Sequence, residues 1–168
     1  MAFLRTLLLA AAAAMAAGAA SAHVAADPGM AAAGGYQAVT FRVGHGCSDT
    51  ATTTALRIEV PEGVLSARAQ PKPGWSLTFE RAPDATRRVT AVTWRGALPP
   101  DQFDEFALFL HLPDTAGVLY FPTVQTCGSA QTRWTDVPEP GSTGRLDHPA
   151  PSLRLTPATP APDAGHHH

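Results

Sequence analysis

The stretch Tyr36-Gln37-Ala38-Val39-Thr40-Phe41-Arg42-Val43 decides the fold class, because its large apolar residues occur at every second position. Val39, Phe41 and Val43 fall on one face and the residues between them on the other, which is the pattern of a half-buried β-strand. The following Gly44-His45-Gly46-Cys47-Ser48-Asp49 has the composition of a loop. The sequence therefore predicts a strand over 36–43 that ends in this loop.

The same alternation recurs along the chain. Further strands are predicted over residues 56–60, 64–69, 75–80, 89–94, 103–112, 118–126, 131–137 and 152–156. Segments 75–80 and 89–94 are predicted to form a hairpin, and the more continuously apolar 103–112 a central strand or a helical turn at its start. Pro122 predicts an edge position or a bulge. Short strands without a convincing helix predict an all-β fold, an antiparallel β-sandwich of the immunoglobulin or cupredoxin kind.

The N-terminus has the layout of a cleavable signal peptide. Arg5 precedes an apolar core over 7–17, and Ala20-Ser21-Ala22 provides the small residues that a signal peptidase prefers. An uncleaved anchor is the alternative, although the apolar core is short for a membrane span. We therefore expect a signal peptide over 1–22, a periplasmic domain over 23–156 and a disordered Ala/Pro tail over 157–168. The tail ends in His166-His167-His168, which are native or an expression tag.

Composition narrows the classes of function. The 168 residues suit one domain, and the net charge of −2 without a basic stripe argues against a nucleic-acid partner. Cys47 and Cys127 would reach an oxidising compartment, where an even number of cysteines favours a disulfide. The alternative is a thiolate pair for Cu(I). The chain carries no Gly-x-Ser-x-Gly, Walker or His-Glu-x-x-His motif, so we expect no enzyme.

Cleavage after Ala22 would make His23 the first residue of the mature chain. Its free α-amine and its imidazole Nδ1 can then bind one metal ion as a chelate. Nitrogen ligands of this kind suit Cu(II) and its tetragonal geometry. The alternative is a frayed, solvated terminal histidine. After residue 22 the chain keeps only Met30, so the thioether clusters that select Cu(I) are absent.

Other side chains are weaker candidates. His45 and His148 lie in predicted loops where metal contact is the less common role, and His111 lies in a predicted strand as an ordinary histidine. The pair Asp104-Glu105 offers carboxylates that would offset the charge of Cu(II), or else forms a solvated strand entrance. Trp134 is typical of a core or cation–π position, but beside a metal it would shield the site.

Several motifs together resemble one family. They are Ala22-His23-Val24, Gly35-Tyr36, Phe41-Arg42-Val43, His45-Gly46-Cys47, Thr53-Thr54-Ala55-Leu56-Arg57, Pro71-Lys72-Pro73-Gly74-Trp75, Asp101-Gln102-Phe103-Asp104-Glu105-Phe106, Leu119-Tyr120-Phe121-Pro122, Gln125-Thr126-Cys127 and Arg133-Trp134-Thr135. This pattern is similar to that of the YcnI-like proteins and extends from His23 to about Leu155.

The resemblance implies an exported copper-binding β-sandwich, often encoded with other copper-handling proteins. It implies that Cu(II) is held by a mono-histidine brace at His23, with Glu105 as a carboxylate ligand and Trp134 nearby. Some relatives add a membrane helix or a second copper-chaperone domain, and a soluble periplasmic form is implied here. We expect a copper chaperone or buffer whose partners are periplasmic or membrane copper-handling proteins. A copper-dependent redox enzyme and an interaction sandwich without metal are the alternatives.

Overall fold

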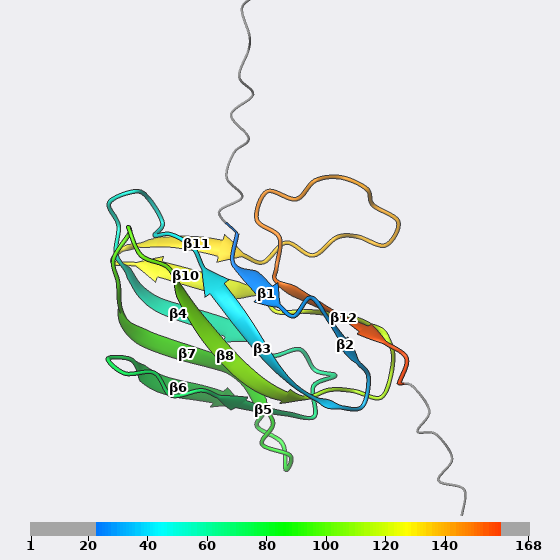
Figure 1. Cartoon of the computed structure of the whole chain (residues 1–168). Helices are drawn as coiled ribbons and strands as arrows, with labels where there is room; N and C mark the ends of the chain where they lie inside the picture. Colours follow the sequence, from blue (N-terminus) through cyan, green and yellow to red (C-terminus); the bar gives the residue numbers. More distant parts are fainter. Residues whose placement is uncertain (1–22, 159–168) are drawn as a thin grey trace, which may run out of the picture.

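The computed structural model describes residues 23–158, and all regular structure in this part of the chain is β-strand (Figure 1). The predicted signal peptide and the end of the predicted tail, from residue 159, lie outside the described residues. The strands form three sheets. The four-stranded sheet has the order β1 (Ala25–Asp27), β3 (Tyr36–Val43), β8 (Asp104–His111), β5 (Ser66–Ala69).

The five-stranded sheet faces the first one. Its order is β11 (Ala130–Trp134), β10 (Thr123–Cys127), β4 (Thr53–Glu59), β7 (Val89–Leu98), β6 (Ser76–Arg81). The small third sheet has the order β2 (Met30–Ala32), β12 (Ser152–Thr156), β9 (Gly117–Tyr120). All strand pairs are antiparallel except β12 with β2. The predicted hairpin of 75–80 with 89–94 is confirmed as the β6–β7 pair.

The core lies between the two larger sheets, and ring contacts cross it. Trp94 of β7 meets Phe106 of β8 with ring centroids 5.6 Å apart, and Phe41 of β3 meets Phe121 at 5.2 Å. All four side chains are buried. Figure 1 shows β3 and β8 crossing in front of β4 and β7. The alternation in the stretch 36–43 thus places one face of β3 in this core, and the predicted β-sandwich is confirmed.

Several strands differ from their predicted bounds, and two of the differences have a clear physical reason. β4 begins at Thr53, β5 begins at Ser66 and β11 ends at Trp134. The predicted strand 118–126 is two strands, because the chain leaves the third sheet after β9 and enters the five-stranded sheet at β10, with Pro122 between them. Proline has no N–H for a ladder, so a change of sheet at this residue costs little. β7 continues past Trp94 to Leu98. Gly96 lies within this extension. A glycine is needed there because the Trp75 indole covers the position, and a Cβ would lie 2.4 Å from the ring.

The segment 24–35 is more ordered than the extended lead-in that its composition predicts. Its β1 pairs with β3, Ala25 lying opposite Arg42, and its β2 pairs with β12. Val24 is buried. The start of the described chain is therefore fixed along the edge of the four-stranded sheet.

Candidate functional site

His23 and Trp134 meet where an edge of each large sheet lies at the same side of the sandwich. His23 lies two residues before β1, the edge strand of the four-stranded sheet. Trp134 is the last residue of β11, the edge strand of the facing sheet. Their ring centroids are 5.4 Å apart and the planes meet at 78°. Trp134 is only 4% exposed, whereas His23 is partly exposed. The structure thus brings together two of the three predicted site residues.

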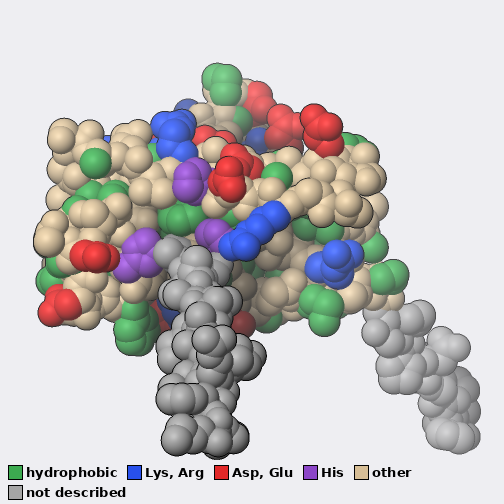
Figure 2. Space-filling view, turned by 90° about the horizontal axis from the view of Figure 1, so that it is seen from above, with side chains coloured by type: hydrophobic (Ala, Val, Ile, Leu, Met, Phe, Trp, Pro, Cys, Tyr) green, Lys and Arg blue, Asp and Glu red, His purple; other side chains and the backbone are tan. Residues whose placement is uncertain are grey.

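A second histidine contacts the same indole. His148 lies 5.3 Å from Trp134 between ring centroids, with the planes at 86°. It belongs to the 135–151 loop between β11 and β12, which Figure 1 shows projecting beside the start of β1. Figure 2 looks onto this end and shows histidine side chains gathered around the point where the described chain begins.

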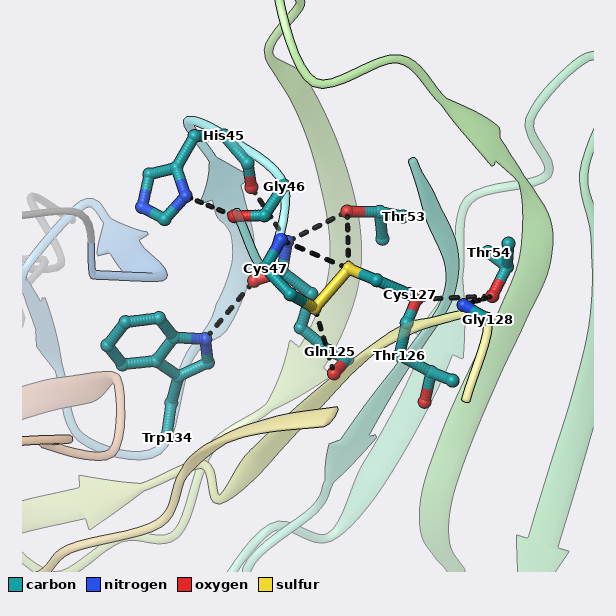
Figure 3. Close-up of a disulfide and its surroundings, with 10 residues drawn as sticks. All are labelled: His45, Gly46, Cys47, Thr53, Thr54, Gln125, Thr126, Cys127, Gly128 and Trp134. Carbon is teal, nitrogen blue, oxygen red and sulfur yellow. Dashed lines mark hydrogen bonds between the residues drawn. A yellow bond between two sulfur atoms is a disulfide. The ribbon is translucent and has the colours of Figure 1, made fainter. Parts of the chain in front are cut away.

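Gln125 fixes the indole from inside the sandwich (Figure 3). Its side-chain oxygen accepts a hydrogen bond from Trp134 Nε1 at 3.4 Å, and its Nε2 donates to the His45 carbonyl at 2.7 Å and to Thr53 Oγ1 at 2.8 Å. Gln125 is 1% exposed, so each of these bonds satisfies a group that water does not reach. The amide therefore ties the orientation of Trp134 to the loop that carries His45.

The predicted disulfide is confirmed and closes the same end of the sandwich. Cys47 lies in the loop after β3, and Cys127 is the last residue of β10, so the bond joins the two facing sheets (Figure 3). The Cys47 N–H also donates to Cys127 Sγ at 3.1 Å. Both cysteines form this bond, so neither is a thiolate in the structure. The alternative of a thiolate pair for Cu(I) is therefore wrong.

Glu105 is held by an arginine. Arg42 lies opposite Glu105 in the β3–β8 ladder, and its Nη2 and Nε lie 2.8 and 2.9 Å from Glu105 Oε1. The pair lies on the outer face of the sheet, whereas Trp134 faces the interior from the other sheet. Two strand spacings, roughly 10 Å, separate Glu105 from β1. The structure therefore does not bring Glu105 to Trp134, and its role as a metal ligand stays a prediction.

The remaining predicted histidines have different surroundings. His45 lies in the loop after β3, where its Nδ1 is hydrogen-bonded to the Gly46 carbonyl. His111 stacks on Tyr36 on the outer face of the four-stranded sheet, with centroids 4.3 Å apart. The terminal His166-His167-His168 lie outside the described residues. Within residues 23–158, no three His, Cys, Asp or Glu side chains are grouped so that they would hold a metal ion.

Gln125 and Asp136 also support this end of the sandwich, and neither is predicted as a site residue from the sequence. The position of Gln125 can be predicted from the disulfide. Residues two apart in a strand share a face, so Gln125 lies on the same face as Cys127, which must face Cys47. Asp136 lies two residues after Trp134, and its Oδ2 accepts a hydrogen bond from the backbone N–H of His148 at 2.9 Å. This contact joins residues twelve positions apart within one loop, so no periodic pattern in the sequence predicts it.

The nitrogen donors at this end of the sandwich fit a copper ion if the chain begins at His23. Imidazoles at His23 and His148 flank the indole, and imidazole is a ligand that Cu(II) favours. In the full sequence the backbone nitrogen of His23 is an amide bonded to Ala22. Only a chain that begins at His23 has a terminal amine there, so the two-nitrogen chelate depends on cleavage.

These features define an all-β protein of the immunoglobulin-like sandwich class, with histidines around one tryptophan at an end. The chain belongs to the family described as a domain of unknown function (DUF1775), whose model matches residues 23–155. This match and the similarity to a copper-binding protein of Bacillus subtilis confirm the family resemblance.

Two known proteins are similar to this chain. The copper-binding protein CutI of Bacillus subtilis (strain 168) is 30% identical over 97 residues, which are 58% of this chain and 47% of the relative. The chain thus spans about half the length of that curated relative. A crystal structure of an uncharacterized protein from Nocardia farcinica, described as revealing an immunoglobulin-like fold, is 38% identical with a TM-score of 0.68. That match covers 82% of this chain and 99% of the other.

Residues 23–158 contain no helix with the length and apolar character needed to cross a membrane.

Proposed function

We propose that this protein is an exported Cu(II)-binding protein that carries or buffers copper in the periplasm. The name of the Bacillus subtilis relative supports the choice of metal. The observation that carries the proposal is the contact of His23 with Trp134, because it ties the predicted first residue of the mature chain to a buried, fixed side chain. A frayed terminus would lack such a contact.

In this proposal His23 supplies two nitrogens, the terminal amine and the imidazole. Trp134 walls the site and limits the approach of water to the metal. Glu105 is the predicted oxygen ligand. Its binding requires that it leave the ion pair with Arg42 and that the two strand spacings between it and β1 be bridged, by movement of its side chain and of His23. Donor and recipient proteins would be other periplasmic or membrane proteins that handle copper.

Retention of one extra residue before His23 tests the proposal. We expect a chain that begins at Ala22 to bind Cu(II) about 100-fold more weakly than a chain that begins at His23, a difference of about 2.7 kcal/mol. The amine becomes an amide in the longer chain, and the second donor of the chelate is lost. Competition titration with a chromophoric chelator measures both affinities, and the electron paramagnetic resonance (EPR) spectrum reports the change in nitrogen ligands.

Mass spectrometry of the exported protein provides the control, because it identifies the N-terminal residue that the cell produces. Equal affinity of the two chains with an unchanged spectrum would rule out the chelate. An exported chain that does not begin at His23 would do so as well.

A further inference from the structure

The 135–151 loop returns to the candidate site at one defined place. Asp136 N–H donates to the His148 carbonyl at 3.0 Å, His148 N–H donates to Asp136 Oδ2 at 2.9 Å, and Ala150 N–H donates to the Asp136 carbonyl at 2.9 Å. Asp136 and Pro149 also form an isolated parallel bridge. These hydrogen bonds join the two ends of the loop, starting at Asp136, two residues after Trp134. They fix the backbone of His148 beside the indole.

The side chain of His148 is exposed although its ring contacts a nearly buried tryptophan. An exposed imidazole that packs edge-on against an indole keeps ring nitrogens within reach of solvent or a ligand. His23 stands against the same indole at nearly the same centroid distance and angle. Trp134 therefore serves as a common support for two imidazoles that come from opposite ends of the described chain.

We propose that His148 supplies a second imidazole to the copper site that begins at His23. The inference rests on the proposed function and adds a ligand that would give the site three nitrogens from two residues, namely the terminal amine and the imidazole of His23 and the imidazole of His148. The lack of any three-residue His, Cys, Asp or Glu group in residues 23–158 is compatible with such a site, because His23 provides two of the donors. Asp136 is a positioning residue, since its carboxylate holds the His148 backbone and not the metal.

Three nitrogen donors favour Cu(II) over the other common divalent ions of the first transition row. The second imidazole would also explain why the loop closes at His148 instead of at a purely apolar residue, which would cover Trp134 equally well.

Pulsed EPR on the chain that begins at His23, loaded with one equivalent of Cu(II), tests the ligand directly. The remote nitrogen of each bound imidazole modulates the spin echo, so one and two imidazoles are distinguishable. We expect two in the wild-type chain and one in His148→Ala, whose Cu(II) affinity falls about tenfold, or about 1.4 kcal/mol. His111→Ala is the matched control, because this histidine stacks on Tyr36 on an outer face, and it leaves both readouts unchanged.

His148→Gln is a second variant that keeps a polar side chain in the loop, and we expect it to behave like His148→Ala. A single imidazole in the wild-type chain, or two in both His148 variants, would overturn the inference. The chain that begins at Ala22 separates this failure from failure of the proposed function. If that longer chain binds weakly while His148→Ala changes nothing, only the role of His148 is wrong; if the longer chain binds as tightly as the shorter one, the chelate itself is wrong.

Discussion

We expect replacement of both Cys47 and Cys127 by serine to lower the free energy of unfolding by about 4.5 kcal/mol. The bond joins residues 80 positions apart, and closure of a loop of this length in the unfolded chain gives a stabilisation of this size in the chain-entropy model. For a domain of this size the loss corresponds to a fall in melting temperature of about 15 °C. Thermal and urea unfolding, each followed by far-ultraviolet circular dichroism, measure the effect.

The wild-type protein unfolded in the presence of a reductant is the matched control, because it loses the crosslink and keeps both sulfur atoms. The reduced protein and the double-serine variant should agree within about 1 kcal/mol, since what remains between them is ordinary side-chain substitution. A loss below 1 kcal/mol in both would show that the hydrogen bonds of Gln125 already hold this end of the sandwich without the disulfide.

We expect Trp94→Ala to lower the free energy of unfolding by about 4 kcal/mol, a loss typical of a fully buried large aromatic side chain. Trp94 is 0% exposed, packs against Phe106 of the facing sheet and donates its Nε1–H to the Gln70 carbonyl at 3.2 Å. The substitution removes contacts across the core and also leaves that carbonyl without its donor. Urea denaturation with a fixed slope of free energy against urea concentration measures the loss.

Phe103→Ala is the matched control, because Phe103 is 67% exposed and its truncation should change stability by less than about 0.5 kcal/mol. Trp94→Phe should fall between the two, since it keeps most of the apolar volume and loses the hydrogen bond. A cost for Trp94→Ala no larger than that for Phe103→Ala would contradict the assignment of Trp94 to the centre of the core.

Most of the fold is predictable because one face of each long strand is buried. In β3 the large apolar residues occur at every second position, and this pattern alone identifies the strand. In β8 the sequence is apolar without interruption from Phe106 to Leu110, and only the burial alternates, so the sequence alone also allows a helical turn there. The short strands β1 and β2 carry no alternating pattern. Each has only three residues, Ala-Ala-Asp in β1 and Met-Ala-Ala in β2, and each forms a strand only because it pairs with β3 or β12. The division at Pro122 is decided by which sheet each half joins, and that is a tertiary property.

The candidate site is predictable only in part. His23 follows from the signal-peptide pattern, and Trp134 from the family resemblance. The contacts of His148 with Trp134 and of Glu105 with Arg42 depend on how loops and strands meet in space. Charge points to the pair Asp104-Glu105, and the family resemblance selects Glu105 as the metal ligand, whereas the register of β3 against β8 places Arg42 beside Glu105.

The anchored β1 strand makes the proposed site sensitive to where the peptidase cuts. Val24 is buried and Ala25 is already paired with Arg42, so only His23 itself precedes the fixed backbone. An extended chain advances about 3.3 Å per residue, which exceeds a metal–nitrogen bond of about 2 Å. A cut one bond too early would therefore place the terminal amine on Ala22, away from the imidazole beside Trp134, and a cut one bond too late would remove His23 itself. The fixed position of β1 therefore makes the site depend on cleavage at a single peptide bond. Recombinant chains that keep vector-derived residues before His23 would lack the terminal amine of the proposed site.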